Sequence, residues 1–215
     1  MTSFCTDRDL LALEPIVFLQ GTASQQFAAG SDGAFSTSVF NSASADFIAA
    51  GIAPGMVLTT SATIPAEGVC HEILSVDSAT TLTVSILRTH DDDAAILPTD
   101  ASGLAWRIRT FAANIVDTSA TMGEELRQRD EIDFDTADFV PSDQLRRLCA
   151  YGTLAAVFLG RCQHASEDDI HWIKAEHYRA EFRRQRNTLT LLTDTNGDNA
   201  AETSRSFGNV QLRRR

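Results

Sequence analysis

Hydrophobic and polar residues alternate over short stretches in the first half of this chain. The clearest alternation lies within residues 80–87. Its predicted inward positions are Leu82, Val84 and Ile86, and its predicted outward positions are Thr81, Thr83 and Ser85. Further β-prone runs, each bounded by turn residues, cover residues 34–40, 56–59, 69–76 and 104–111. Regularly spaced short strands of this kind predict a small β-barrel or β-sandwich.

Turn residues divide this β-rich segment, which spans residues 21–111. The run Gly30–Gly33 predicts a turn ahead of a strand. Asp46–Ala50 predicts one helical turn closed by Gly51, because glycine readily adopts the left-handed cap conformation. The charged run Arg88–Asp93 predicts an exposed loop.

Helical signals precede the β-rich segment. Thr6–Asp9 has the spacing of a capping box, and Pro15 disfavours helical geometry at the residue before it. We therefore expect a short helix from Thr6 to Glu14. The apolar run Ile16–Leu19 is predicted to be a strand that leads into the β-rich segment.

Helical spacing returns after Asn114. An apolar helix is predicted to begin at Pro141–Asp143 and to end near Cys162. Its small residues Gly152, Ala155 and Ala156 would let a neighbouring helix approach closely. A second helix signal at residues 166–169 predicts a helix that continues to residue 186, where several arginines complement the helix dipole.

These elements predict an α+β fold: a helical bundle scaffold with an inserted small β-barrel or β-sandwich module and a C-terminal β-hairpin. Residues 1–20 would supply the N-terminal helix and lead-in strand of the scaffold, and residues 21–111 the inserted module. Residues 112–215 would supply the remaining helices, the hairpin and an arginine tail. The hairpin would pair residues 189–192 with residues 207–212 across the turn at residues 194–198.

Composition places the chain among globular proteins. It has 215 residues, of which 43% are hydrophobic and 22% charged. No apolar run has the length of a membrane span, and the first residues lack the pattern of a signal peptide, so we expect cytoplasmic synthesis and no membrane partner. The cysteines at positions 5, 70, 149 and 162 form no CxxC pair and are expected to be buried, reduced thiols.

The formal net charge of −11 is unevenly distributed. Residues 117–143 are acidic, whereas residues 144–186 are on balance basic, and nearly all basic residues are arginine. Arginine suits bidentate pairing with carboxylates at interfaces. This polarity predicts contacts between copies of the chain, although such charge runs are also typical of solvated faces. The predicted assembly residues are Arg179, Arg183, Arg184, Arg186, Glu124, Glu125, Asp130, Asp133 and Asp135.

A calcium-like spacing near the C-terminus is the strongest metal candidate. Asp194, Asn196 and Asp198 alternate as oxygen ligands do in a calcium loop. The loop lacks the glycine and the bidentate glutamate of that motif, since Asn199 and Arg205 stand in their places. Asn-Gly is also a preferred hairpin turn, so we predict no metal.

Catalytic chemistry has little basis in the sequence. His90 beside Asp91–Asp93 is the best local cluster, but no second histidine stands at ligand spacing. Trp172, Tyr178 and Phe182 lie among arginines, a mixture that either stacks on bases or packs as an aromatic edge. We predict no catalytic residue, no cofactor and no enzymatic activity.

Four stretches of the chain resemble structural proteins of tailed bacteriophages. Cys5–Pro15, together with the pairing of helix 143–162 and the arginine-rich helix 166–186, is similar to head–tail adaptor (connector) proteins. Ala45–Gly55 resembles the β-modules inserted in various phage structural proteins. The inserted module departs from the plain helical pattern of the adaptors, which leaves open another neck or tail-completion role.

The resemblance implies a virion protein at the neck, which forms a homo-oligomeric ring, usually twelvefold, below the portal protein. The ring would surround passing DNA without reading its sequence and would also contact tail or neck proteins. The predicted docking residues for those partners are Val210, Leu212, Arg213, Arg214 and Arg215. Two alternatives are a binding protein whose β-module recognises carbohydrate or protein, and a metal-dependent hydrolase.

Overall fold

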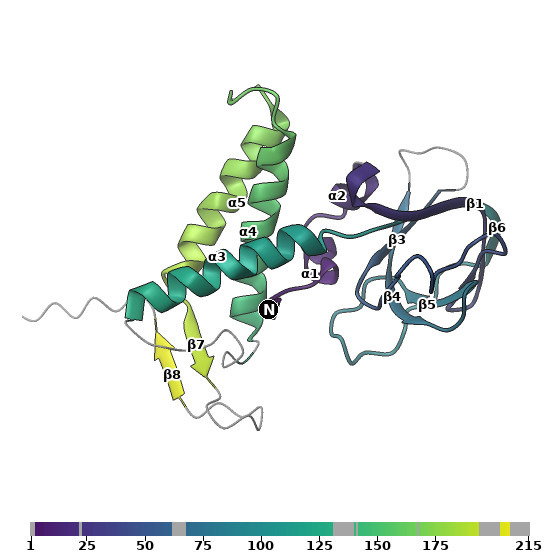
Figure 1. Cartoon of the computed structure of the whole chain (residues 1–215), viewed down its shortest axis with the longest axis horizontal. Coiled ribbons are helices and arrows are strands. Elements are labelled where there is room, and N and C mark those ends of the chain that lie inside the picture. The colour runs from purple at the N-terminus through teal and green to yellow at the C-terminus, as the bar shows by residue number, and fades with distance from the viewer. Residues whose placement is uncertain are drawn as a thin grey trace, which may run out of the picture. The chain divides into compact units, whose positions relative to one another are not determined.

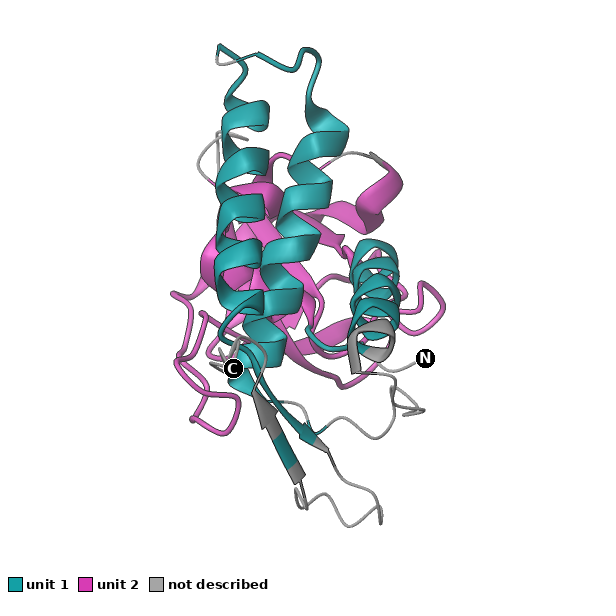
Figure 2. Cartoon of the chain, turned by 90° about the vertical axis from the view of Figure 1, so that its left-hand side faces the viewer, with its two compact units in different colours: residues 1–5, 112–215 teal, residues 6–111 magenta. Residues whose placement is uncertain are grey.

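The computed structural model divides the chain into two compact units (Figures 1 and 2). The barrel unit is Thr6–Phe111, and the helical unit combines Met1–Cys5 with Ala112–Arg215. The structure describes residues 3–21, 23–61, 68–130, 140, 142–166, 168–193 and 203–206.

A closed antiparallel barrel forms the centre of the barrel unit (Figure 1). Its strands follow one another in the order β1-β2-β5-β4-β3-β6, and β6 pairs with β1 to close the ring. They are β1 (Gln26–Ser36), β2 (Val39–Asn41), β3 (Val57–Ser61), β4 (Val69–Val76), β5 (Thr81–Ser85) and β6 (Ala101–Arg109), with a 3₁₀ turn η1 (Ala23–Gln25) before β1. Of the two alternatives for residues 21–111, the structure contains the barrel.

Aromatic side chains fill one part of the barrel interior. The Trp106 ring lies edge-on to Phe40 and Phe47, with ring centroids 5.8 and 5.5 Å apart. Gly30 and Gly33 pass directly over this cluster: a Cβ on Gly33 would lie 2.8 Å from the Phe40 ring, and one on Gly30 would lie 2.6 Å from the Trp106 nitrogen. The turn predicted at Gly30–Gly33 is therefore wrong, because these glycines instead let β1 run across the indole with a shift of register.

The alternation predicted for residues 80–87 is correct only in its first part. Leu82 and Val84 are completely buried, as expected. Ser85 is also buried, whereas 39% of Ile86 is exposed. The pattern breaks because the Ile96 amide donates to the Ser85 hydroxyl at 2.8 Å, so a neighbouring segment covers an outward position.

Two short helices belong to the barrel unit. Helix α1 (Asp7–Leu13) begins as predicted, with the Asp9 carboxylate accepting the Thr6 amide at 2.8 Å. Ile16–Leu19 is the helix α2, so the predicted strand is wrong. Pro15 precedes it with φ −56°, a value already suited to a helix start. Residues 6–20, which the sequence placed with the scaffold, are thus grouped with the barrel.

The helical unit contains three longer helices and a hairpin. They are α3 (Ala112–Asp130), α4 (Asp143–Arg161) and α5 (Ile170–Arg186), followed by β7 (Thr190–Thr193) and β8 (Thr203–Ser206). Ser142 caps α4 by accepting the Leu145 amide at 3.2 Å, which confirms the predicted start. Asp169 caps α5 by accepting the His171 amide at 2.8 Å, which places that start slightly later than predicted.

The predicted helical bundle scaffold is wrong. Helices α4 and α5 lie side by side, but α3 crosses them and is seen almost end-on in Figure 2. A bundle requires helices that run nearly parallel or antiparallel to one another. The fold is α+β with a closed six-stranded barrel, and α1 and α2 contact barrel strands.

The C-terminal hairpin pairs β7 with β8, with Thr190 opposite Ser206 and Thr193 opposite Thr203. The partner of the first strand is therefore Thr203–Ser206. The strand predicted at residues 207–212 lies outside the residues that the structure describes.

We predict that Asp7 makes the barrel unit less stable as the pH rises. Burial raises the pKa of Asp7 to about 6, although Thr110 and the Phe111 amide donate hydrogen bonds to its carboxylate. The folded state thus favours the protonated form of Asp7. The stability that this preference contributes is complete below the unfolded pKa near 3.8 and is lost as the pH passes 6. The loss amounts to about 3 kcal/mol.

Urea unfolding between pH 4 and 7, followed by Trp106 fluorescence in a Trp172→Phe background, measures this effect. In Asp7→Asn the stability should rise relative to the parent as the pH increases. Asp92→Asn, which alters an exposed carboxylate of the same unit, is the control and should follow the parent. Parallel curves for the parent and Asp7→Asn would contradict the assignment.

Candidate functional site

A groove of about 410 Å³ lies between α3, α4 and α5 of the helical unit. Each helix contributes a different kind of surface, so the groove has an apolar floor and two charged walls. Its lining residues include Asp117, Glu125, Gly152, Leu159, Arg179 and Arg183.

The floor of the groove comes from small residues of α4. Gly152 lies against both α3 and α5: an added Cβ would be 2.9 Å from a Thr118 methyl group and 3.1 Å from the Phe182 ring. Ala156 and Leu159 continue the floor, and 39% of Leu159 is exposed. The prediction that small residues on this helix admit close neighbours is consistent with this geometry.

The α5 wall is basic. Arg179 pairs with Glu176 on its own helix at 2.7 Å, and Arg186 reaches across to Glu125 of α3 at 2.9 Å. Arg183 is exposed, and no ion pair joins it to any residue that the structure describes. Its guanidinium is therefore the cation of this wall with most freedom to bind another molecule.

The α3 wall is acidic. Asp117 and Glu125 line it, and both are exposed. Glu125 is partly neutralised by Arg186, whereas Asp117 stands further along the helix, toward its N-terminus. The groove is thus bounded by opposite charges on its two sides.

The structure brings four of the predicted assembly residues to this groove: Arg179, Arg183, Arg186 and Glu125. Two others lie elsewhere on the same helices. Arg184 is exposed and pairs with Glu181, and its hydrogen bond lowers the pKa of that carboxylate. Glu124 is exposed on α3 but does not line the groove.

The remaining predicted residues are not placed. Asp130 lies at the end of α3, where the side chain is not described, and Asp133 and Asp135 lie outside the described residues. The same holds for the metal candidates Asp194, Asn196 and Asp198. It also holds for the docking residues Val210, Leu212, Arg213, Arg214 and Arg215.

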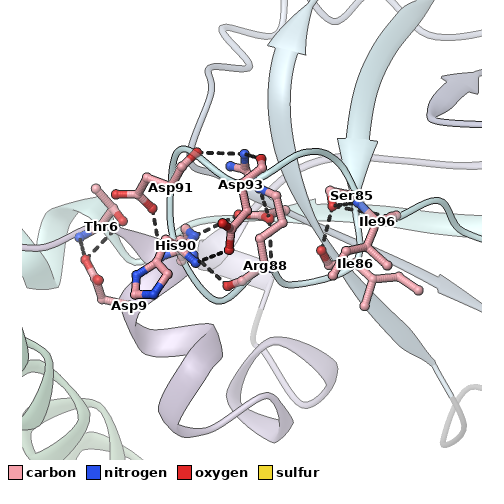
Figure 3. Close-up of polar contacts among 11 residues, drawn as sticks. Thr6, Asp9, Ser85, Ile86, Arg88, His90, Asp91, Asp93 and Ile96 are labelled. Atoms are coloured by element: carbon pink, nitrogen blue, oxygen red, sulfur yellow. Dashed lines mark hydrogen bonds and ion pairs between the residues drawn. The ribbon is translucent and has the colours of Figure 1, made fainter.

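The loop with His90 and Asp91–Asp93 is tied to the barrel by ion pairs (Figure 3). Arg88 donates to the buried Glu72 carboxylate at 2.6 Å and to the Asp91 and Asp93 carbonyl oxygens at 2.7 Å. Arg8 pairs with Glu72 and with Asp91, each at 2.8 Å. These contacts give Arg88 and Asp91 a structural role in holding the loop.

Within the described ranges, no group of three or more histidine, cysteine or acidic side chains is arranged to hold a metal ion. His71 is the most deeply buried histidine of the barrel unit, and burial lowers its pKa to about 4. Its Nε2 lies 3.2 Å from the Thr60 hydroxyl.

Tyr178 of α5 packs inward. Tyr178 is 6% exposed and stacks on Phe158 of α4, with ring centroids 5.8 Å apart. Tyr151 of α4 also stacks on Tyr178, with ring centroids 6.1 Å apart. Tyr178 therefore serves the packing of α4 on α5, which was the structural alternative to base stacking.

Comparisons of the chain with protein-family models, with curated proteins and with solved structures return no match. Among the helices that the structure describes, none combines the length and the apolar character needed to cross a membrane.

We predict that Gly152→Val destabilises the helical unit by about 1–3 kcal/mol, because the new side chain would collide with Thr118 and Phe182. Gly160→Val is the matched control on the same helix, since nothing lies within 4 Å of a Cβ at that position. Its stability should change by less than about 0.5 kcal/mol. Urea unfolding followed by Trp172 fluorescence, in a Trp106→Phe background, tests the difference; equal effects would show that α4 is not packed closely at Gly152.

Proposed function

We propose that this protein is a structural virion protein, a head–tail adaptor whose copies form a ring below the portal and join the capsid to the tail. The observation that carries the proposal is the groove of the helical unit, with its apolar floor and oppositely charged walls. The resemblance of residues 5–15, 143–162 and 166–186 to adaptor proteins supports the same function.

The occupant of the groove is the next copy of the chain. Arg179 and Arg186 are already paired within the chain, which leaves Arg183 and the exposed Leu159 to meet a neighbour. The complementary charge comes from an exposed carboxylate of the neighbour's α3 that lies outside its own groove, such as Glu124. A contact between two different surfaces of the same protein repeats from copy to copy and closes into a ring when the rotation per subunit permits.

The composition of the chain supports a ring through which DNA passes without being retained. The chain carries a net charge of −11, and the affinity of a protein for DNA grows with the number of cations that it presents to phosphates. In the proposed ring, arginines such as Arg183 are engaged by neighbouring carboxylates, so few remain to bind passing DNA. We propose twelve subunits, the usual number in the adaptor rings that the chain resembles.

The location of the protein tests this function directly. Antibodies raised against the purified chain and coupled to gold particles should label tailed particles at the junction of head and tail. Labelling of the capsid surface or the tail tip, or the absence of the chain from purified particles, would refute the adaptor role.

The groove contact is tested by reversing one charge. We predict that Arg183→Glu reduces ring formation on portal particles at least tenfold, because the new carboxylate would repel the acidic face of the neighbour. Arg184→Glu should have a smaller effect, since Arg184 pairs with Glu181 and does not line the groove. Negative-stain electron microscopy and sedimentation measure ring occupancy.

Arg147→Glu is the matched control, because Arg147 is an exposed arginine of α4 that does not line the groove. It makes the same change of net charge and should assemble as the parent does. Equal losses in Arg183→Glu and Arg147→Glu would attribute the effect to overall charge. Full assembly of Arg183→Glu would exclude the groove as the contact.

A further inference from the structure

Two buried cysteines lie in contact within the helical unit. The Sγ atoms of Cys5 and Cys149 are 3.1 Å apart, although the residues are 144 positions apart in the sequence. Cys5 is 3% exposed and Cys149 is completely buried. A disulfide has a sulfur–sulfur distance of about 2.0 Å, so the two sulfurs need to approach by only about 1 Å to form one.

Ser119 of α3 connects the surroundings of both thiols. Its hydroxyl oxygen accepts the Phe4 amide at 3.0 Å and lies 3.4 Å from Cys149 Sγ. Either group can donate in this contact between Ser119 and Cys149, and the Cys5 thiol donates to Cys149 Sγ. Hydrogen bonds donated to a sulfur favour its thiolate form, which is the form that reacts in disulfide exchange.

We propose that Cys5 and Cys149 are a redox modification site, at which a low-molecular-weight disulfide such as glutathione disulfide oxidises the pair to an intramolecular disulfide. In the first step the Cys5 thiolate attacks one sulfur of glutathione disulfide, whose S–S bond breaks and releases one glutathione thiolate. In the second step the Cys149 thiolate attacks Cys5 Sγ in the mixed disulfide and displaces the second glutathione. Two protein thiols are oxidised, and one glutathione disulfide is reduced to two glutathione molecules that carry the two protons.

Access to the pair comes through the segment that holds Cys5. Phe4 and Cys5 precede α1 and lie in no helix or strand, whereas Cys149 lies in the interior of α4. Local opening of this segment exposes Cys5 to the oxidant, and its return brings the mixed disulfide against Cys149. The disulfide then links Cys5 covalently to α4. Cys5 directly precedes Thr6, the first residue of the barrel unit.

The other two cysteines lack such a partner arrangement. Burial raises the pKa of Cys70 to about 11, so its thiolate is scarce at neutral pH. Burial likewise raises the pKa of Cys162, with Asp169 acting in the same direction. The double variant Cys70→Ser/Cys162→Ser therefore keeps only the proposed pair and removes side reactions.

The test incubates this double variant in its native state with glutathione disulfide and then alkylates the remaining thiols. We expect a monomer lighter by two hydrogen atoms, and a single cross-linked peptide pair that contains Cys5 and Cys149. The thermal unfolding midpoint should rise by at least about 5 °C, because the bond closes a long loop in the unfolded chain. Dithiothreitol should reverse both changes.

Matched variants with Cys5→Ser or Cys149→Ser added in the same background should show no loss of hydrogen and no rise in the midpoint. The proposal is overturned if both thiols of the double variant remain open to alkylation. Persistent glutathione adducts or disulfide-linked dimers would also overturn it, and so would a disulfide that leaves the unfolding midpoint unchanged.

Discussion

One buried hydrogen bond joins the two ends of the barrel unit: the Phe111 amide donates to the Asp7 carboxylate at 2.7 Å. The chain therefore enters and leaves this unit at neighbouring points, which allows the whole barrel to be inserted between residues of the helical unit. On the helical side, the Phe4 amide bonds Ser119 and anchors the segment before the insertion. The carboxylate lies in a buried position that penalises its charged form, so this closure is coupled to proton binding.

The sequence predicts β3, β4, β5 and β6 better than β1 and β2, because the single strand predicted at residues 34–40 is wrong: this stretch contains the turn between β1 and β2. The alternation of hydrophobic and polar residues correctly predicts that Leu82 and Val84 are buried, because the burial of each depends on its position within its own strand. It fails at Ser85, which the segment with Ile96 covers through its amide, and at Gly30–Gly33, whose backbone crosses an indole contributed by β6. Both failures depend on contacts with residues outside the strand itself, which a local pattern does not contain.

The helices show the same division between local and distant causes. The caps at Ser142 and Asp169 are made by a side chain and an amide two or three residues away, so the sequence predicts those starts closely. The crossing of α3 over α4 depends on Gly152 meeting Thr118 and Phe182, and no spacing in α3 reveals it. The sequence indicated the small residues of the groove floor and the charged residues Arg183 and Glu125 of its walls, but only the structure places them in one groove.

Pairing within the chain changes how the charge asymmetry of the sequence should be interpreted. Arg179, Arg184 and Arg186 each have a carboxylate partner within the helical unit, so their charges do little to select a neighbour. Exposed pairs of this kind contribute about 1 kcal/mol or less. Specificity in the proposed contact therefore concentrates on Arg183 and on the apolar floor beside Leu159. Because that floor exists only while α3 and α5 pack around Gly152, the packing that stabilises the helical unit also shapes the proposed assembly surface.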